Sequence, residues 1–254
     1  MVKNINFLTI GVLSLAIASL CFTSCDKGWD PSEGDFFENV GYYSNGSYFM
    51  PIAGTDNEIA LTNADAYGDV KADLKNSTTS YSVPQQLTFG GKTYTVTSIG
   101  EGVFDNFRNL ASVTFPNTIT SIGNGAFLNC ISLTNINLPN SLISIGERAF
   151  SFCEKLASIT LPASLTSIGN GAFLHCISLT NINLPNSLTS IGDGAFGECH
   201  ALMDITCLAT TPPAGAHIFD PQTYEEATLH VPAAAVDAYK AAQGWSMFQH
   251  IVGF

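Results

Sequence analysis

Four cysteines recur at a fixed spacing of 23 residues, and thiols are well suited to bind a metal or to form disulfides. They are Cys130, Cys153, Cys176 and Cys199. No pair shows the C-x-x-C spacing of a zinc site, and the related segment one period earlier has Phe107 at this position. An exchange of Phe for Cys is typical of an apolar core position. We therefore expect buried free thiols, with disulfides and a metal site as weaker alternatives. Cys207 stands where related segments have leucine, so we expect it to be buried too.

Residues 192–197 match the G-x-G-x-x-G pattern that brings a backbone close to the pyrophosphate of a dinucleotide. The two leading glycines recur at 123–128 and 169–174, where the last position is leucine. A phosphate site of this type also needs a strand before the pattern and a helix after it, and neither is indicated here. We interpret these glycines as parts of a repeated turn and predict no nucleotide cofactor.

Histidines and carboxylates show no arrangement with a catalytic use. His175 and His200 lie beside two of the cysteines, but the position of His175 holds Asn, Phe or Glu in related segments, which is typical of an exposed surface. Five acidic residues near the N-terminal side could ligate calcium but lack the spacing of a calcium loop, so a solvated acidic face is favoured. They are Asp56, Glu58, Asp65, Asp69 and Asp73. Because Ser and Thr recur with the repeat rather than in a nucleophile–base set, we predict no catalytic residue, no metal, no cofactor and no enzymatic activity.

An internal repeat positions all of these residues. Five units of 23 residues begin at Val96, Ile119, Leu142, Leu165 and Leu188. The second unit, ITSIGNGAFLNCISLTNINLPNS, differs from the fourth at two positions only. Within it, Ile136 and Leu138 alternate with Asn135 and Asn137, which predicts a short strand with one buried face that ends at Pro139.

A single unit of this kind cannot bury its own apolar side chains. We expect Ala149 and Phe150 to return to the interior on the wall opposite the strand. Stacking the units at about 4.8 Å per turn buries these side chains and pairs each strand with its neighbours. The sequence therefore predicts an α/β repeat solenoid, mostly β, whose five turns span about 24 Å.

Both ends of such a stack need a cover. Residues 86–89 and 92–96, joined by Gly90 and Gly91, predict a β-hairpin. We place this hairpin in a β-rich N-terminal cap that covers residues 39–95 and precedes the repeats.

The solenoid is assigned to residues 96–210 and the C-terminal cap to residues 211–254. In this cap we predict a strand at 227–231 and a helix at about 233–243 that ends at Gly244. The expected core contacts of the cap are Trp245, Phe248 and Ile251.

The repeated pattern I-G-x-x-A-F-x-x-C-x-x-L-x-x-I-x-L-P-x-S resembles that of the BspA-like leucine-rich repeat proteins of bacterial surfaces. The C-terminal segment T-L-H-V-P-A-A-A-V-D-A-Y-K-A-A-Q-G-W is similar to the cap of many members. The resemblance covers residues 96–254 closely and residues 81–95 more loosely. It implies a leucine-rich repeat stack at the cell surface, and for some members adhesion to host matrix proteins or to other bacteria.

A basic residue followed by an apolar stretch at 7–22 predicts an export signal over residues 1–24, too short to span a bilayer comfortably. The small residues before Cys25 resemble the lipobox of bacterial lipoproteins, in which this cysteine is acylated. Cys21 is the weaker candidate because a bulky leucine precedes it, and an ordinary signal peptide remains an alternative. We predict lipid attachment at Cys25, anchoring in the outer membrane at the cell surface, and an acidic tether over residues 25–38.

The overall composition excludes several classes of protein. A net charge of -12 with only 9 basic residues disfavours a nucleic-acid partner. The 46% of hydrophobic residues excludes global disorder, and no apolar run reaches the roughly 20 residues of a spanning helix. The chain therefore has the composition of an acidic, exported, globular protein.

The exposed side of the predicted strand wall is the leading candidate for a binding surface, because solenoids commonly bind ligands on their concave face. The candidate partner-binding residues are Asn135, Asn137, Ser158, Thr160, Asn181, Asn183, Asp204 and Thr206, and Ser112 and Thr114 continue the same face. A competing surface is formed by N-terminal aromatic residues, which could equally be cap core. They are Tyr42, Tyr43, Tyr48, Phe49 and Tyr67.

These observations predict a non-catalytic, lipid-anchored surface protein, monomeric, whose solenoid binds a protein or glycan of a host matrix or of another cell. The alternative is a structural accessory subunit of a bacterial envelope complex. Neither prediction involves a nucleic acid.

Overall fold

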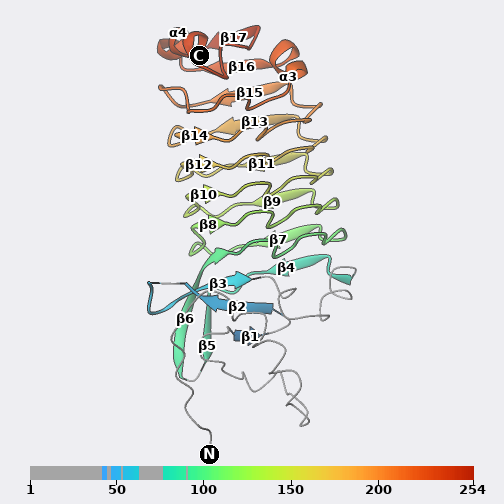
Figure 1. Ribbon diagram of the computed structural model, residues 1–254, viewed down its shortest axis with the longest axis vertical. Helices are drawn as coiled ribbons and strands as arrows, with labels where there is room; N and C mark the ends of the chain where they lie inside the picture. The colour runs from blue at the N-terminus through green and yellow to red at the C-terminus, as the bar shows by residue number, and fades with distance from the viewer. Residues whose placement is uncertain (1–41, 45–46, 53, 63–76, 90) are drawn as a thin grey trace, which may run out of the picture.

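The structure is a computed structural model that describes residues 42–44, 47–52, 54–62, 77–89 and 91–254. The predicted export signal, Cys25 and the acidic tether lie outside these residues, so their assignment stays a prediction. The described chain forms a column of stacked turns, with β1 to β3 near one end and β17 at the other (Figure 1).

One wall of the column consists of strands that lie parallel to one another and come from successive turns. They are β4 (Ser80–Ser82), β7 (Ser112–Thr114), β9 (Asn135–Asn137), β11 (Ser158–Thr160), β13 (Asn181–Leu184), β15 (Asp204–Cys207), β16 (Thr228–Val231) and β17 (His250–Gly253). The isoleucine at the centre of each strand from β9 to β15 is buried and its neighbours on both sides point outward. We call the outward side of this wall the strand face.

The second wall carries two-residue strands that continue from the end of the longer β6, and these are also parallel and in register. They are β6 (Lys92–Ile99), β8 (Ser121–Ile122), β10 (Ser144–Ile145), β12 (Ser167–Ile168) and β14 (Ser190–Ile191). In Figure 1 the two walls run side by side along the column, joined by turns at each level.

A ladder of phenylalanine rings runs through the interior of the column. Its members are Phe104, Phe127, Phe150, Phe173, Phe196 and Phe219. Consecutive rings are stacked with centroids 5.0 to 5.4 Å apart, which matches the spacing of neighbouring strands. The predicted interior positions are confirmed, since Ala149 and Phe150 are fully buried. The mostly-β repeat solenoid is therefore confirmed as well.

The stack has about seven turns rather than the five units that are evident in the sequence. On the N-terminal side, β4 pairs in parallel with β7, so Tyr81 lies beside Val113. On the C-terminal side, β16 and β17 continue the same sheet, with Leu229 beside Ile205 and Ile251 beside Leu229. The additional turns lack the regular 23-residue spacing but keep the strand pairing.

The N-terminal end is a mixed β-structure. It contains β1 (Tyr42–Ser44), β2 (Ser47–Pro51), β3 (Glu58–Thr62) and β5 (Gln86–Phe89). The predicted hairpin is confirmed, since β5 and β6 are antiparallel and Phe89 pairs with Lys92. Of the N-terminal aromatic residues, Phe49 is buried, so it belongs to the cap core, and Tyr67 lies outside the described residues.

The C-terminal end differs in detail from the prediction. The strand expected at 227–231 is β16, but the expected helix is a 3-10 turn, η3 (Ala233–Ala235), followed by a short α4 (Val236–Ala241). Ala242 already has an extended backbone, so the helix ends before Gly244. A helix that we did not predict, α3 (Pro221–Glu226), begins where the Asp220 carboxylate accepts a hydrogen bond from the backbone of Thr223.

The predicted core contacts of the C-terminal cap are confirmed for two residues and partly for the third. Trp245 and Phe248 are buried, and Ile251 is half-buried against the core. Trp245 Nε1 also donates a hydrogen bond of 2.8 Å to the Pro213 carbonyl. The rings of the cap close the phenylalanine ladder, since both Trp245 and Phe248 meet Phe219 edge-on.

Candidate functional site

The candidate partner-binding residues lie together in two columns on the strand face. Asn135 stands beside Ser158 and Asn181 beside Asp204, while Asn137 stands beside Thr160 and Asn183 beside Thr206. All eight side chains are exposed except that of Thr206, which is half-buried. Because strands are regularly spaced, this surface repeats its amide and hydroxyl groups at about 5 Å along the column.

The amides of the strand face are largely free for a ligand. Among the described residues, none hydrogen-bonds with the side chain of Asn135, Asn137 or Asn183. Asn181 only donates to the neighbouring Thr180 hydroxyl, over 3.1 Å. An amide group can both donate and accept, so each can meet either kind of polar atom on a partner.

Serines beside the second wall behave differently, although they recur with the same period. Ser141, Ser164 and Ser187 each donate a hydrogen bond of 2.6 Å to a backbone carbonyl of the preceding turn. These hydroxyl groups hold neighbouring turns together. The recurrence of these three serines therefore has a structural reason.

The strand face extends beyond the residues that we proposed from the sequence. In β16 and β17 the columns continue with Thr228 and His250 and with His230 and Val252. His230 Nε2 lies 3.9 Å from the Asp204 carboxylate, which places a charged group beside an imidazole at this end of the strand face. The alternation in T-L-H-V was visible in the sequence, but its alignment with the repeated strands was not.

The cysteine ladder is buried as predicted. All five described cysteines are free thiols without exposed surface. Cys130, Cys153, Cys176 and Cys199 donate hydrogen bonds of 3.1 to 3.3 Å to a phenylalanine carbonyl of the preceding turn. Burial raises the pKa of Cys199 from its usual 9.0 to about 12, and it raises those of Cys153 and Cys176 well above that usual value. Protonated, enclosed thiols are poor nucleophiles and poor metal ligands.

The glycines of the G-x-G-x-x-G pattern serve the repeat. A side chain at Gly192 would overlap the backbone of Asn170 in the preceding turn, so this glycine allows the turns to approach closely. Gly194 has a φ of 62°, a left-handed conformation that favours glycine. Both roles belong to the turn, and no helix follows the pattern as a phosphate site requires.

The outer corner of the stack carries the predicted variable position. His175 has a φ of 60°, and its Nδ1 lies 2.9 Å from the Glu198 carboxylate of the next turn. Its side chain is 30% exposed and stacks against Phe152, with ring centroids 4.9 Å apart. His175 is therefore part of a row of side chains from adjacent turns, in which it contacts Phe152 on one side and Glu198 on the other.

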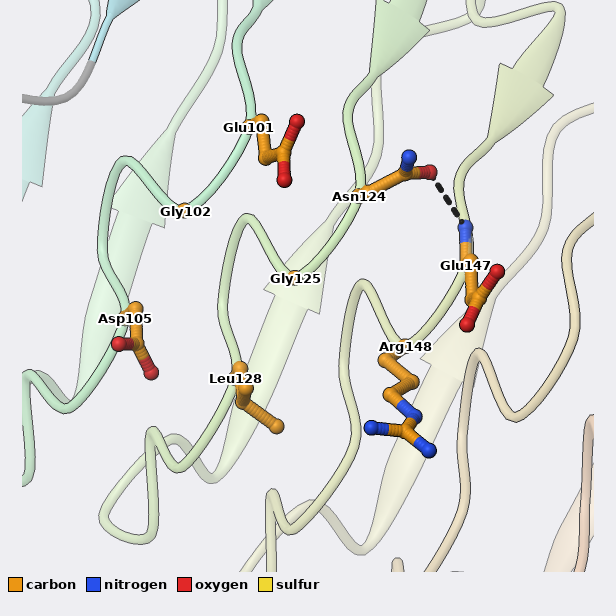
Figure 2. Close-up of a pocket in the computed structure, with 8 residues that line it drawn as sticks. All are labelled: Glu101, Gly102, Asp105, Asn124, Gly125, Leu128, Glu147 and Arg148. Atoms are coloured by element: carbon orange, nitrogen blue, oxygen red, sulfur yellow. Dashed lines mark hydrogen bonds between the residues drawn. The ribbon is translucent and has the colours of Figure 1, made fainter.

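An open hollow lies at the turns that follow β6, β8 and β10. Figure 2 shows Glu101, Asp105 and Glu147 around it, together with Arg148 and the Asn124 amide that accepts from the Glu147 backbone. Arg148 has a φ of 53° where related units have glycine. Among the described residues, no group of three or more His, Cys, Asp or Glu side chains could hold a metal ion. The hollow therefore offers mixed charges without a ligand set, and the strand face remains the stronger candidate.

No helix in the described part of the chain has both the length and the apolar character to cross a membrane.

Comparison with protein families matches residues 94–224 to six copies of the BspA type leucine rich repeat region. No curated protein matches the chain. A solved leucine-rich repeat protein of T. pallidum is 27% identical, with a TM-score of 0.53 and 71% of each chain covered.

Two further solved structures are similar. A leucine-rich repeat protein from Bacteroides ovatus is 26% identical with a TM-score of 0.58, covering 78% of this chain and 48% of that one. The pneumococcal vaccine antigen PcpA is 20% identical with a TM-score of 0.60, covering 79% of this chain and 52% of that one, so it supports the fold alone. The chain thus spans about half the length of these two proteins.

Proposed function

Because the chain belongs to the BspA-type leucine-rich repeat family, we propose that it is a non-catalytic binding module whose strand face contacts a protein or glycan partner. The observation that carries this proposal is the set of exposed amides in β9 and β13, of which Asn135, Asn137 and Asn183 form no side-chain hydrogen bond with a described residue. Polar side chains with no internal partner cost the fold little and are available to a ligand.

The chemistry of the face narrows the kind of partner. Asn135, Asn137, Asn181 and Asn183 offer donors and acceptors without charge, and Ser158 and Thr160 add hydroxyl groups between them. An extended ligand with regularly placed polar atoms, such as a glycan chain or a polypeptide segment, matches a face that repeats every turn. The partner would belong to a host matrix or to the surface of another cell.

The location proposed for this module is the cell surface. The export signal at residues 1–24 and the small residues before Cys25 support lipid attachment at that cysteine, in the outer membrane. Mass spectrometry of the membrane-bound protein tests this directly, because an acylated Cys25 at the N-terminus has a defined added mass. An unmodified cysteine would contradict the anchor and leave the binding proposal standing.

The binding proposal is tested with two matched double variants of the processed chain, against a panel of matrix proteins and glycans. Asn135→Lys with Asn181→Lys places two charges on the strand face and is expected to abolish saturable binding. Asn140→Lys with Asn186→Lys adds the same charges at exposed asparagines beyond the strands and is expected to leave binding unchanged. Equal affinity of both variants would reject the strand face as the site.

A well-folded chain that binds no member of the panel would favour the alternative, a structural accessory subunit of an envelope complex. That function predicts co-purification with membrane partners after cross-linking on intact cells. Unlike the first proposal, it does not require the amides of the strand face.

A further inference from the structure

The last strand of the four-stranded sheet at the C-terminal end has an open edge among the described residues. In the order β13-β15-β16-β17, β17 pairs only with β16 among the described residues. The Phe254 backbone N–H donates to the Val231 carbonyl, and the Phe254 carbonyl accepts from Ala233. In a strand, the backbone N–H and C=O groups of every second residue point to the same neighbouring strand. The backbone groups of His250 and Val252 therefore also point to β16. The N–H and C=O groups of Ile251 and Gly253 therefore point to the open side.

This edge lacks several of the features that normally prevent pairing with another chain. Natural edge strands carry lysine, proline or a bulge, but residues 250–254 contain none of these. The side chains beside the edge are instead apolar and exposed, with Val252 at 46% and Phe254 at 61%. An open edge flanked by exposed apolar side chains is a docking surface for a further strand.

We propose that the occupant of this edge is a second copy of the same chain, paired antiparallel through β17 about a two-fold axis at Val252. In this register Ile251 lies opposite Gly253 of the second copy, and the two residues exchange both backbone hydrogen bonds, as does the symmetric pair.

The side chains in this register are complementary. On the strand face, Val252 meets its own counterpart, and His250 lies opposite Phe254 of the second copy, which are favourable apolar and aromatic cross-strand pairs. On the other face, Ile251 lies opposite Gly253, which has no side chain of its own and packs against Ala233 and Val236. A register centred on Ile251 or on Gly253 would lose this match.

The position of β17 determines which ends of two molecules the pairing would join. β17 lies at the opposite end of the column from β1 to β3 (Figure 1). This step rests on the proposed anchoring of the chain upstream of β1. Two anchored copies would then meet at their outer tips, so the same pairing could link two protein-covered surfaces.

The pairing is expected to be weak in solution. The paired strands are only four residues long, so the contact is smaller than the roughly 1,200 Å² of a stable interface. Such an interaction leaves the chain monomeric when dilute and becomes populated when many copies are held on two surfaces that face each other.

The experiment measures the mass of the processed chain with Cys25→Ser by sedimentation over rising concentration. The parent chain is expected to shift toward twice its monomer mass. Val252→Lys and Val252→Glu each place like charges opposite one another and are expected to lose this shift. An equal mixture of the two variants is expected to regain it, because residue 252 faces itself across the axis.

The matched control is Ile143→Lys, which makes a similar change at an exposed aliphatic residue of 48% exposure on the second wall and is expected to keep the shift. A parent chain that stays monomeric at the highest concentration would overturn the proposal. So would a mixture that fails to regain the shift, or a control that loses it. Melting curves verify that each variant is folded. Pairing does not involve Asn135 or Asn181, so its failure and the failure of strand-face binding are separate results.

Discussion

The strand face and the second wall come from the same repeat, yet they use their polar side chains in opposite ways. Beside the second wall, the Ser164 hydroxyl donates a hydrogen bond of 2.6 Å to the Leu142 carbonyl of the preceding turn. The side chains of Ser158 and Thr160, on the strand face, are exposed and form no hydrogen bond with a described residue. A recurring polar residue is therefore structural on one wall and available to a partner on the other.

The geometry of the backbone explains this difference. Where parallel strands pair, their N–H and C=O groups satisfy one another, so a strand needs no help from its side chains. At the corners the chain turns, and carbonyl groups there require other donors. Ser141, Ser164 and Ser187 occupy such corners just before the second wall. Polar side chains are therefore available to a partner where the backbone groups of paired strands already hydrogen-bond with one another.

The largest expected effect comes from the core that both walls share. Phe150→Ala removes a fully buried ring from the middle of the ladder and is expected to lower the free energy of unfolding by about 3–5 kcal/mol. Phe152→Ala, at a half-buried ring of the outer corner that packs against His175, is expected to cost about 1 kcal/mol. Urea unfolding of the two variants checks this, and similar losses would contradict a single shared core.

The second effect concerns the contact between turns beside the second wall. Gly192→Ala would force a side chain into the Asn170 backbone and is expected to cost about 3 kcal/mol. In Gly194→Ala the added carbon has no atom within 4 Å, so the cost comes from the left-handed backbone conformation alone. This substitution is expected to lower the free energy of unfolding by about 1 kcal/mol. Arg148 already tolerates the equivalent backbone position in another turn. Equal costs in denaturant unfolding would mean that close packing is not the reason for Gly192.

The third effect is the response of the buried thiols to alkali. Burial raises the pKa of Cys199 from its usual 9.0 to about 12, so between these values the thiol ionises only after unfolding. Its stabilising contribution is complete below pH 9.0 and is lost as the pH rises toward 12. Each such thiol lowers the free energy of unfolding by about 1.4 kcal/mol per pH unit in this range.

Cys199→Ser is the matched variant for this effect, because serine can still donate toward the Phe173 carbonyl but does not ionise in this range. Urea unfolding between neutral and alkaline pH is expected to show a shallower decline for the variant. A parallel decline in both proteins would mean that the Cys199 thiol is accessible in the folded state.

Much of the fold was predictable because the repeat imposes it locally. The alternation around Ile136 gave the strand, and the exchange of Phe107 with cysteine gave the buried thiols. The alignment of β16 and β17 with the strand face was not predictable, since Leu229 and Ile251 depart from the 23-residue spacing. Their pairing depends on long-range packing. For the same reason, His230 and His250 were absent from the site that we proposed.

The helix α3 was missed for a different reason. Asp220 followed by Pro221 is a recognisable helix start, but the helix has six residues and no clear apolar periodicity, so pattern analysis passes over it. The hydrogen-bond partners of the serine hydroxyl groups could not be predicted from the sequence either. The sequence showed that serines recur, but not that Ser164 donates to a neighbouring turn while Ser158 does not.

The smallest expected effect separates the two walls most directly. Ser164→Ala leaves the Leu142 carbonyl without this donor and is expected to lower the free energy of unfolding by about 1 kcal/mol. Ser158→Ala, six residues earlier on the strand face, is expected to change it by less than about 0.5 kcal/mol, because its hydroxyl is exposed and bonds with no residue that the structure describes.

Ligand binding is expected to reverse this order. Ser158→Ala removes a polar atom between Asn135 and Asn181 and should weaken binding to the partner, whereas Ser164→Ala should leave affinity unchanged at temperatures where it is folded. A loss of stability in Ser158→Ala as large as in Ser164→Ala would show that strand-face hydroxyls also hold the stack together. The free polar groups would then not distinguish a binding surface from a structural one.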